Sequence, residues 1–324
     1  MTEMDNLDSL LRCPRCLSPL ECGEASYRCT SKTCPYGPSG APFPVIGAQP
    51  VLIDFAESLF DREFFTDGCL SRPPGGAGLG STVRQRAKRV LKRLLRGENA
   101  AARRMSARFM AEAKAVVQRP RILVVGGGTV GSEAEALYDD PGVTLVGTDV
   151  FASPLTVVVS DAHRLPFPNE SFDGVWIQAV LEHVLDPHQV VAQIHRVLKS
   201  EGLVYAGTPF MQQVHMGAYD FTRFTLSGHR WLFRRFEQIE AGAAGGAGVA
   251  TIWSIRYLAR AIGAGPLLAG AIAAPFFWLR FFDRIARPGA NADAASGVYF
   301  FGRKSARTLM PKDMPAYYET GGGA

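Results

Sequence analysis

The alternation of short β-branched runs with longer helical stretches, from Arg121 onward, constrains the fold of this chain more than any other feature. Such alternation predicts βαβ units and a mostly parallel sheet with helices on its faces. Seven runs have the pattern of strands, and they begin at residues 122, 143, 155, 172, 203, 236 and 297. We therefore expect an α/β fold with a doubly wound, Rossmann-like, seven-stranded sheet over residues 119–305.

A glycine-rich loop follows the first of these runs and precedes the helical stretch SEAEALYDD. Its glycines are Gly126, Gly127, Gly128 and Gly131. Glycine lets the backbone approach a ligand closely, and a helix N-terminus offers free N–H groups. Asp149 ends the next run, where a carboxylate can accept hydrogen bonds from two ribose hydroxyls. The pattern predicts a nucleoside-containing cofactor; it fits NAD as well as S-adenosylmethionine (SAM), and the literal spacing G-x-G-x-x-G favours NAD.

The segment from 161 to 210 favours SAM over NAD, because it resembles the class I SAM-dependent methyltransferases of the type 11 group. The family's L-P-F, F-D and L-E-H-V segments occur here in order, at 165–167, 172–173 and 181–184. The resemblance covers roughly residues 119–242 and the last strand, although Val124 stands where the family usually has an acid. It implies that SAM is the co-substrate and that Asp161 and Ala162 flank the adenine. The expected SAM-binding residues are Gly126, Gly127, Gly128, Gly131, Asp149, Asp161, Ala162 and Gln178.

Methyl transfer from SAM mainly requires an aligned acceptor, and it needs a general base only where the acceptor loses a proton. Ligands of open α/β sheets gather at the carboxyl ends of the strands, so acceptor-binding candidates follow the fourth and fifth runs. Those candidates are Gln178, Glu182, His183, His215, Tyr219 and Asp220. We expect His215, Tyr219 and Asp220 to be catalytic, with ordering of the loop backbone as the alternative role of His215. For His183 we expect capping and packing of the helix that follows.

A cluster of cysteines marks the N-terminal segment, where five of the six in the chain fall between residues 13 and 34. Four thiolates suit a structural zinc ion and can fold a segment too short to stabilise itself. The expected ligands are Cys13, Cys16, Cys29 and Cys34, with Cys22 as an alternative. The stretch FPVIGAQPVLIDF, from residue 43, resembles the end of a small zinc-ribbon family whose members activate RNA and protein methyltransferases. We therefore expect a zinc ribbon over residues 1–56, fused to the methyltransferase domain.

Residues 57–118 are expected to hold a linker and a basic helical segment. The stretch RPPGGAGLG, at 72–80, suits neither a helix nor a strand interior. Residues 83–108 carry ten Lys or Arg against one acid, and the first part of this stretch predicts a basic amphipathic helix. Such a helix either packs on the sheet domain or lies against an anionic membrane. Nucleic acid is a disfavoured partner because aromatic stacking residues are absent from the stretch.

A helical insertion is expected at about 247–287, between the last two strands, and residues 306–324 form a tail. The insertion contains 19 uncharged residues from 261 to 279, interrupted by Gly and Pro, so we expect two helices rather than a membrane span. It would emerge beside the substrate pocket. An apolar lid there favours an acceptor with a lipid or membrane-proximal part, and the alternative is a lid or dimer surface without such a role.

The sequence therefore predicts SAM-dependent methyl transfer to a small-molecule acceptor, such as a hydroxyl of a glycan or of a lipid-linked sugar. The alternatives are a non-catalytic SAM-binding or partner-activating module and an NAD-dependent oxidoreductase. The first residues lack the basic start and apolar run of a secretory signal, so we expect the cytosol, with peripheral association at the inner face of the membrane.

Overall fold

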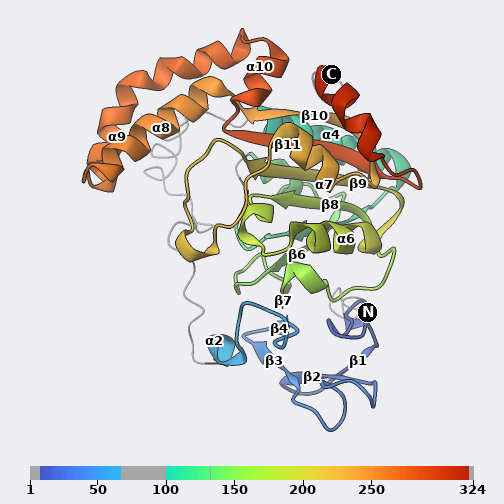
Figure 1. Ribbon diagram of the computed structural model, residues 1–324. Coiled ribbons are helices and arrows are strands. Elements are labelled where there is room, and N and C mark those ends of the chain that lie inside the picture. The colour runs from blue at the N-terminus through green and yellow to red at the C-terminus, as the bar shows by residue number, and fades with distance from the viewer. Residues whose placement is uncertain (1–7, 67–99, 132, 321–324) are drawn as a thin grey trace.

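A computed structural model describes residues 8–66, 100–131 and 133–320 (Figure 1). Its strands form one sheet of eleven, in the order β1-β2-β3-β4-β7-β6-β5-β8-β9-β11-β10. The N-terminal strands are β1 (Leu20–Cys22), β2 (Ser26–Cys29), β3 (Phe43–Ile46) and β4 (Gln49–Leu52). The others are β5 (Arg121–Val125), β6 (Thr144–Asp149), β7 (Val158–Ser160), β8 (Phe172–Gln178), β9 (Leu198–Pro209), β10 (Phe236–Gly245) and β11 (Gly297–Lys304).

The strands of the predicted α/β region pair as a mixed, mostly parallel sheet. Strands β7, β6, β5, β8 and β9 run parallel, whereas β11 is antiparallel to both β9 and β10. The sheet has eleven strands rather than the expected seven because β4 pairs in parallel with β7, through Val51 with Val159 and Leu52 with Ser160. The N-terminal segment therefore extends the sheet at the edge formed by β7.

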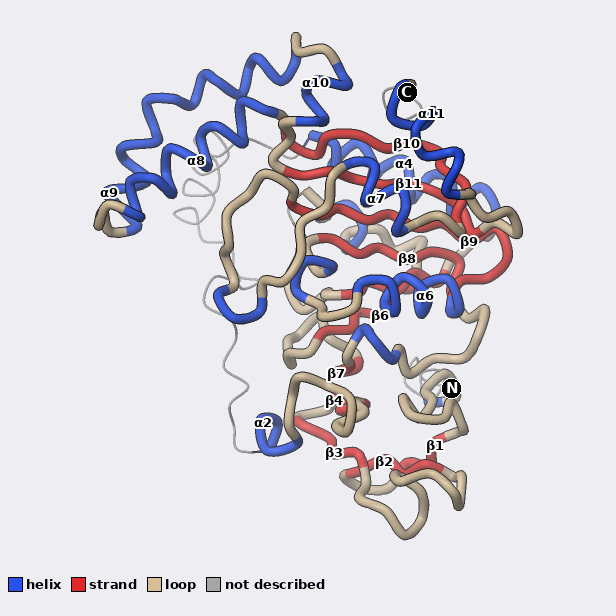
Figure 2. The backbone as a smooth tube through the Cα atoms, viewed as in Figure 1, coloured by secondary structure: helices blue, strands red, loops and turns tan. Residues whose placement is uncertain are grey.

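Helices cover both faces of the sheet, as a doubly wound fold requires. Side chains alternate between the faces of a strand. On β5, Leu123 and Val125 pack in one cluster with α6 (Pro187–Val197), whereas Ile122 and Val124 pack in another with α4 (Ala100–Val116). Both clusters are buried, which accounts for the continuous apolar runs of the parallel strands. α7 (Leu226–Leu232) contacts β10 and β11 beyond α6, and α11 (Met314–Glu319) in the C-terminal tail contacts α7 (Figure 2).

Local structure differs from expectation at two helix starts. The stretch SEAEALYDD forms only the four-residue α5 (Glu135–Tyr138). The N–H groups available to a cofactor are therefore those of the glycine loop itself, and not those of a long helix. The L-E-H-V segment forms a separate 3-10 turn, η2 (Leu181–His183), and does not open α6. α6 instead begins at Pro187, behind the N-cap Asp186, whose side chain accepts from Gln189 N at 3.0 Å. The basic helix expected at 83–96 and the linker at 72–80 lie outside the described residues.

The insertion folds as a helical hairpin that projects from the end of the sheet (Figures 1 and 2). It consists of α8 (Ala247–Ala261), α9 (Pro266–Ala273), the 3-10 helix η4 (Ala274–Arg284) and the short α10 (Pro288–Asp293). Asp283 of η4 accepts from the N–H groups of Gly248 at 2.7 Å and Val249 at 3.3 Å, which caps α8 from the opposite arm. The stretch Pro266–Arg284 is long and apolar enough to cross a membrane by length and composition, and most of it is exposed.

Candidate active site

The glycine loop turns the chain tightly after β5. Gly126 has φ of +73°, in the left-handed region that favours glycine. The N–H of Gly128 donates to Asp149 Oδ2 at 2.9 Å, and a Cβ placed on Gly128 would lie 2.7 Å from the same oxygen. A Cβ on Gly131 would similarly lie 2.7 Å from Gln178 Oε1. The structure thus brings the loop against the ends of β6 and β8, where a side chain at Gly128 or Gly131 would displace Asp149 or Gln178.

The predicted cofactor residues fit the nucleoside end of SAM. Asp149 is partly buried, and burial raises its pKa, while N–H groups including that of Gly128 act in the opposite direction. A carboxylate beside a backbone cradle offers the hydrogen-bond acceptors that ribose hydroxyls require. Val124 is 4% exposed and packs against Gly127, so the loop N–H groups, rather than an acid on β5, would hold the amino acid end of SAM.

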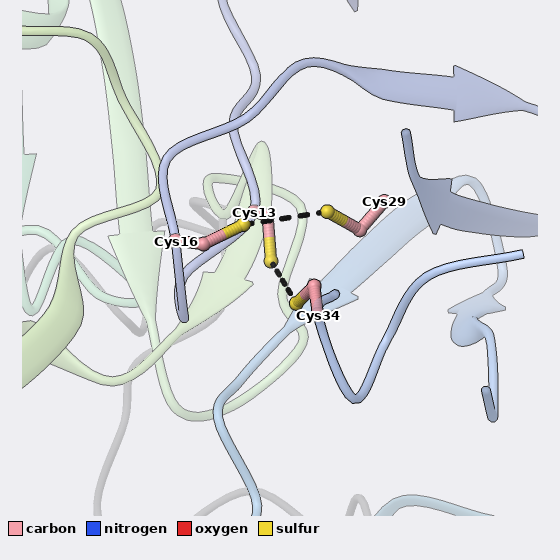
Figure 3. Close-up of side chains that lie close together, drawn as sticks. All are labelled: Cys13, Cys16, Cys29 and Cys34. Carbon is pink, nitrogen blue, oxygen red and sulfur yellow. Dashed lines mark hydrogen bonds between the residues drawn. The ribbon is translucent and has the colours of Figure 1, made fainter. Parts of the chain in front are cut away.

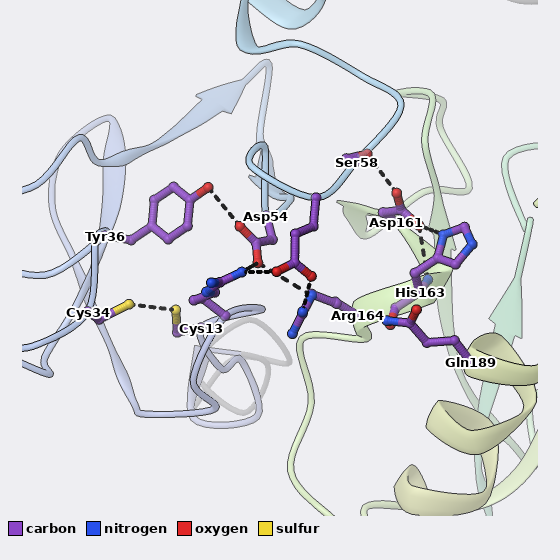
Figure 4. A network of polar contacts seen from close by, with 11 residues as sticks. Cys13, Cys34, Tyr36, Asp54, Ser58, Asp161, His163, Arg164 and Gln189 are labelled. Carbon is purple, nitrogen blue, oxygen red and sulfur yellow. Dashed lines mark hydrogen bonds and ion pairs between the residues drawn. The ribbon is translucent and has the colours of Figure 1, made fainter. Parts of the chain in front are cut away.

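Asp161 is held by contacts from two directions (Figure 4). Its Oδ1 accepts from the backbone N of His163 at 2.9 Å and from His163 Nδ1 at 2.6 Å. Its Oδ2 accepts from Ser58 at 2.6 Å. Burial acts to raise the pKa of Asp161, but the hydrogen bonds from His163 and Ser58 outweigh it and lower that pKa. Asp161 is therefore an ionised group fixed beside Ala162, partly by the N-terminal segment.

An ion-pair network joins the N-terminal segment to the predicted SAM pocket (Figure 4). Asp54 is 2% exposed and accepts from Arg15 at 3.1 Å and from the hydroxyl of Tyr36 at 3.1 Å. Glu57 pairs with both Arg15 and Arg164, and the latter lies in the turn η1 (Ala162–Arg164). The N-terminal segment therefore contacts residues of the predicted site directly, through Ser58 with Asp161 and Glu57 with Arg164.

Aromatic side chains after β4 line the same edge, and sequence reasoning missed them. The ring of Phe60 stacks on Tyr219 with centroids 6.1 Å apart, and Phe64 meets Phe151 at 6.4 Å. Phe64 belongs to the short α2 (Arg62–Thr66). The aromatic run ESLFDREFF was visible in the sequence, but nothing in it indicated that it lies against a loop more than 150 residues away.

The four predicted cysteine ligands come together (Figure 3). Sγ of Cys13 lies 3.7 Å from Sγ of Cys34, and Sγ of Cys16 lies 3.4 Å from Sγ of Cys29. All four sulfur atoms are within 4.8 Å of one another. A tetrahedral zinc ion with Zn–S bonds of about 2.3 Å separates its sulfur ligands by about 3.8 Å, so the arrangement fits zinc. Cys22 is exposed, and its Sγ donates to the Gly23 carbonyl within its own turn, at 3.5 Å.

The predicted catalytic residues lie in the loop after β9. Asp220 has a side chain that is 1% exposed, forms a two-pronged ion pair with Arg223, and accepts from the backbone N of His215 at 2.9 Å. Burial acts to raise the pKa of Asp220, but Arg223 and His215 outweigh it and lower this pKa to about 2. Asp220 is thus a weak base that positions His215. Tyr219 contributes its carbonyl to the site, and its ring is half-exposed.

Glu182 and His183 face this loop from the turn η2. The expectation that His183 packs and caps a helix is wrong, because its ring faces His215 with centroids 5.0 Å apart and its Nδ1 lies 2.6 Å from the Tyr219 carbonyl. Glu182 is fully buried, and this burial raises its pKa to about 8. Both residues follow β8, whose carboxyl end meets that of β9 at one edge of the sheet.

A cavity of about 630 Å³ opens beside this loop. It is lined by Gln212, Gln213, Val214, Asp220, Arg223 and, from the insertion, Tyr257 of α8. The helical hairpin therefore borders the space next to the predicted catalytic residues, as expected for an insertion on the substrate side.

Comparison with known proteins supports a methyltransferase domain in this part of the chain. Residues 123–206 match the family described as "Methyltransferase domain". The chain is 33% identical over 105 residues to a demethylmenaquinone methyltransferase of Renibacterium salmoninarum, covering 29% of this chain and 44% of that protein. It is 32% identical over 142 residues to the ubiquinone/menaquinone biosynthesis C-methyltransferase UbiE of Stutzerimonas stutzeri, covering 38% of this chain and 56% of that protein.

The chain thus spans about half the length of the curated relatives that it matches. Among solved structures, phosphoethanolamine N-methyltransferase 2 of Haemonchus contortus, in complex with SAM, aligns with a TM-score of 0.40 and 16% identity. That alignment covers 61% of this chain and 52% of the other.

Proposed function

We propose that this chain transfers a methyl group from SAM to a small-molecule acceptor. The observation that carries the proposal is the cradle formed by Gly126, Gly127 and Gly128 against the partly buried carboxylate of Asp149, within the segment that matches the methyltransferase family. When bound, SAM supplies an activated methyl group. The chain then needs only to hold the nucleoside, exclude water and present an acceptor.

The residues divide between these tasks. Asp149, Asp161 and Ala162 would bind the nucleoside, and the glycine loop with Gln178 would hold the amino acid end. His215 would bind the acceptor or receive a proton from it, since its side chain is 25% exposed, lies 4.0 Å from Glu182, and follows Gln213 and Val214, which line the cavity. Asp220 orients His215, and Tyr219 shields the site together with Phe60.

The acceptor that we propose carries a lipid or another apolar group, such as a lipid-linked sugar hydroxyl or a quinone precursor like the substrates named for the relatives. The supporting observation is the hairpin beside the cavity, which exposes large apolar side chains along its length. Leu267 is 92% exposed, and Ile262 and Ile285 are nearly as exposed. Arg260 and Arg284 lie among them and suit anionic headgroups. We therefore propose peripheral association with the cytosolic face of a membrane.

Liposome flotation and turnover test the membrane part of this proposal. Leu267→Asp and Ile262→Asp alter exposed tips of the hairpin and should reduce binding to vesicles containing anionic lipid at least tenfold. Val116→Asp is the matched control, because Val116 is 78% exposed at the end of α4, away from the hairpin. Equal flotation of all three variants and the wild type would exclude the hairpin as a membrane contact.

A structural zinc ion in the cysteine cluster is also part of the proposal, which makes the N-terminal segment a zinc ribbon fused to the domain it supports. Four sulfur ligands leave no open position, so zinc would act on folding and not on the reaction. Metal analysis of the full chain should find zinc, and Cys13→Ser should remove one equivalent. A full chain that folds without metal would contradict the ribbon.

Calorimetry and labelled transfer test the central claim against the two alternatives. We expect binding of SAM and of its demethylated product, and none of NAD; a preference for NAD would indicate an oxidoreductase. Transfer from labelled SAM to lipid extracts should depend on His215, and SAM binding with no transfer to any fraction would favour a non-catalytic SAM-binding module.

A further inference from the structure

Glu182 is a buried carboxyl group whose oxygens have no hydrogen-bond partner among the described residues. Its side chain is 0% exposed, and neither carboxylate oxygen accepts a hydrogen bond from another residue that the structure describes. Burying a carboxyl group in this way opposes folding, because it loses its hydration and gains no hydrogen bond in return. Such a group requires an explanation, which the proposed SAM pocket does not provide.

Two imidazole rings face this carboxyl group. Nε2 of His183 lies 3.6 Å and Nε2 of His215 lies 4.0 Å from Oε1 of Glu182. Both distances are too long for hydrogen bonds. Three potential ligand atoms thus point toward one another within 4.8 Å without bonding to one another.

The outer nitrogen of each ring identifies its tautomer. Nδ1 of His183 lies 2.6 Å from the carbonyl oxygen of Tyr219, which can only accept, so Nδ1 carries the proton. Nδ1 of His215 lies 3.3 Å from Asp220 Oδ2 and 3.4 Å from the Gln213 carbonyl, which again are acceptors. In a neutral ring the Nε2 lone pair therefore points at the carboxylate. Metal-binding histidines show the same arrangement, with the outer N–H fixed by a carbonyl or a carboxylate.

We propose that Glu182, His183 and His215 bind one divalent transition-metal ion. Ligand atoms about 2.1 Å from a common ion lie about 3.0 to 3.4 Å apart, so the separations of Glu182 Oε1 from the two imidazole nitrogens, 3.6 Å and 4.0 Å, need to close by about 1 Å or less. The half-exposed loop that carries His215 can supply this movement. Two imidazoles and one carboxylate suit Mn²⁺, Fe²⁺, Co²⁺ or Zn²⁺ and leave coordination positions open.

This ion would be separate from the zinc of the cysteine cluster, because its ligands come from the ends of β8 and β9. If the proposed function holds, an acceptor hydroxyl ligated at an open position would lose its proton more readily. The existence of the metal site does not depend on that chemistry.

Titration of the full chain with Mn²⁺, followed by the electron paramagnetic resonance of the free ion, tests the site. Thiolates bind Mn²⁺ poorly, so the cysteine cluster does not interfere. We expect one bound Mn²⁺ per chain, with Glu182→Gln and His215→Gln each raising the Kd at least tenfold. Glu201→Gln and His188→Gln are matched controls on exposed residues and should bind as the wild type does.

Circular dichroism establishes that the variants are folded, and His215→Gln changes only a partly exposed loop residue. Calorimetry with SAM on the same proteins should give wild-type affinity, so loss of the metal site and failure of the proposed SAM pocket are measured separately. The proposal is overturned if the wild type shows no saturable Mn²⁺ binding, or if the Glu182 and His215 variants bind Mn²⁺ as tightly as the controls do.

Discussion

Replacing Gly128 by alanine tests the cofactor cradle. The new Cβ would lie 2.7 Å from Oδ2 and 3.0 Å from Cγ of Asp149, both below ordinary van der Waals contact. The carboxylate of Asp149 would have to rotate away, and it would lose the hydrogen bond from Gly128 N. It would then no longer meet the two ribose hydroxyls of SAM. Each hydrogen bond to a charged group is worth about 1.5 kcal/mol, so the loss of two weakens binding by about 3 kcal/mol, or about 100-fold in Kd.

Calorimetry with SAM and with its demethylated product measures this change. Gly270→Ala is the matched control, because a Cβ there meets nothing within 4 Å and the residue lies in α9. It should leave the SAM affinity unchanged and stabilise the helix slightly. If Gly128→Ala binds SAM within threefold of the wild type, Asp149 is not the ribose ligand and the geometric reasoning is wrong.

Three further predictions concern stability. Asp54→Ala should lower the free energy of unfolding by about 2 kcal/mol in urea titrations, because it leaves the buried hydroxyl of Tyr36 unpaired; adding Tyr36→Phe should recover part of the loss, and strict additivity would argue against the contact. Burial lowers the pKa of His229 to about 3, so between pH 3 and 6.5 the unfolded chain binds the extra proton and stability rises with pH. The free energy of unfolding should therefore be about 2 kcal/mol lower at pH 5 than at pH 7 because of His229. His229→Phe should reduce this dependence of the free energy of unfolding on pH, and an unchanged dependence would rule out His229 as its source. Chelation of the metal from the full chain should lower the melting temperature of the wild type and leave that of Cys13→Ser unchanged, as measured by calorimetry.

The mostly parallel sheet of the α/β region followed from patterns in the sequence, and the reason is physical. Parallel strands are buried on both faces of the sheet, so β5, β8 and β9 appear in the sequence as continuous apolar runs. A strand with one face in water would instead alternate apolar and polar residues. The glycines after β5 and the acid at the end of β6 mark the positions where the backbone must approach a ligand. Their meeting at 2.9 Å follows from the parallel pairing of β5 with β6.

The N-terminal extension of the sheet could not be predicted, because it depends on a non-local pairing. β4 has four residues and joins β7 more than 100 residues away, through only two paired positions. No periodicity within either strand specifies the partner. The ion pairs of Asp54 and Glu57 that support the pairing involve common surface residue types, which carry no signal of their own in a sequence.

The residues that follow β8 show where sequence reasoning ends within a site. Strand ends predict that Glu182, His183 and His215 converge, and they do. The direction of each side chain depends on the 3-10 turn η2, on the carbonyl of Tyr219 and on the ion pair of Asp220 with Arg223, none of which a motif specifies. If the L-E-H-V segment had opened the helix that continues as α6, His183 would have been a residue on the surface of that helix. The turn instead directs it toward Glu182, and this one change of local geometry converts a packing residue into a potential metal ligand.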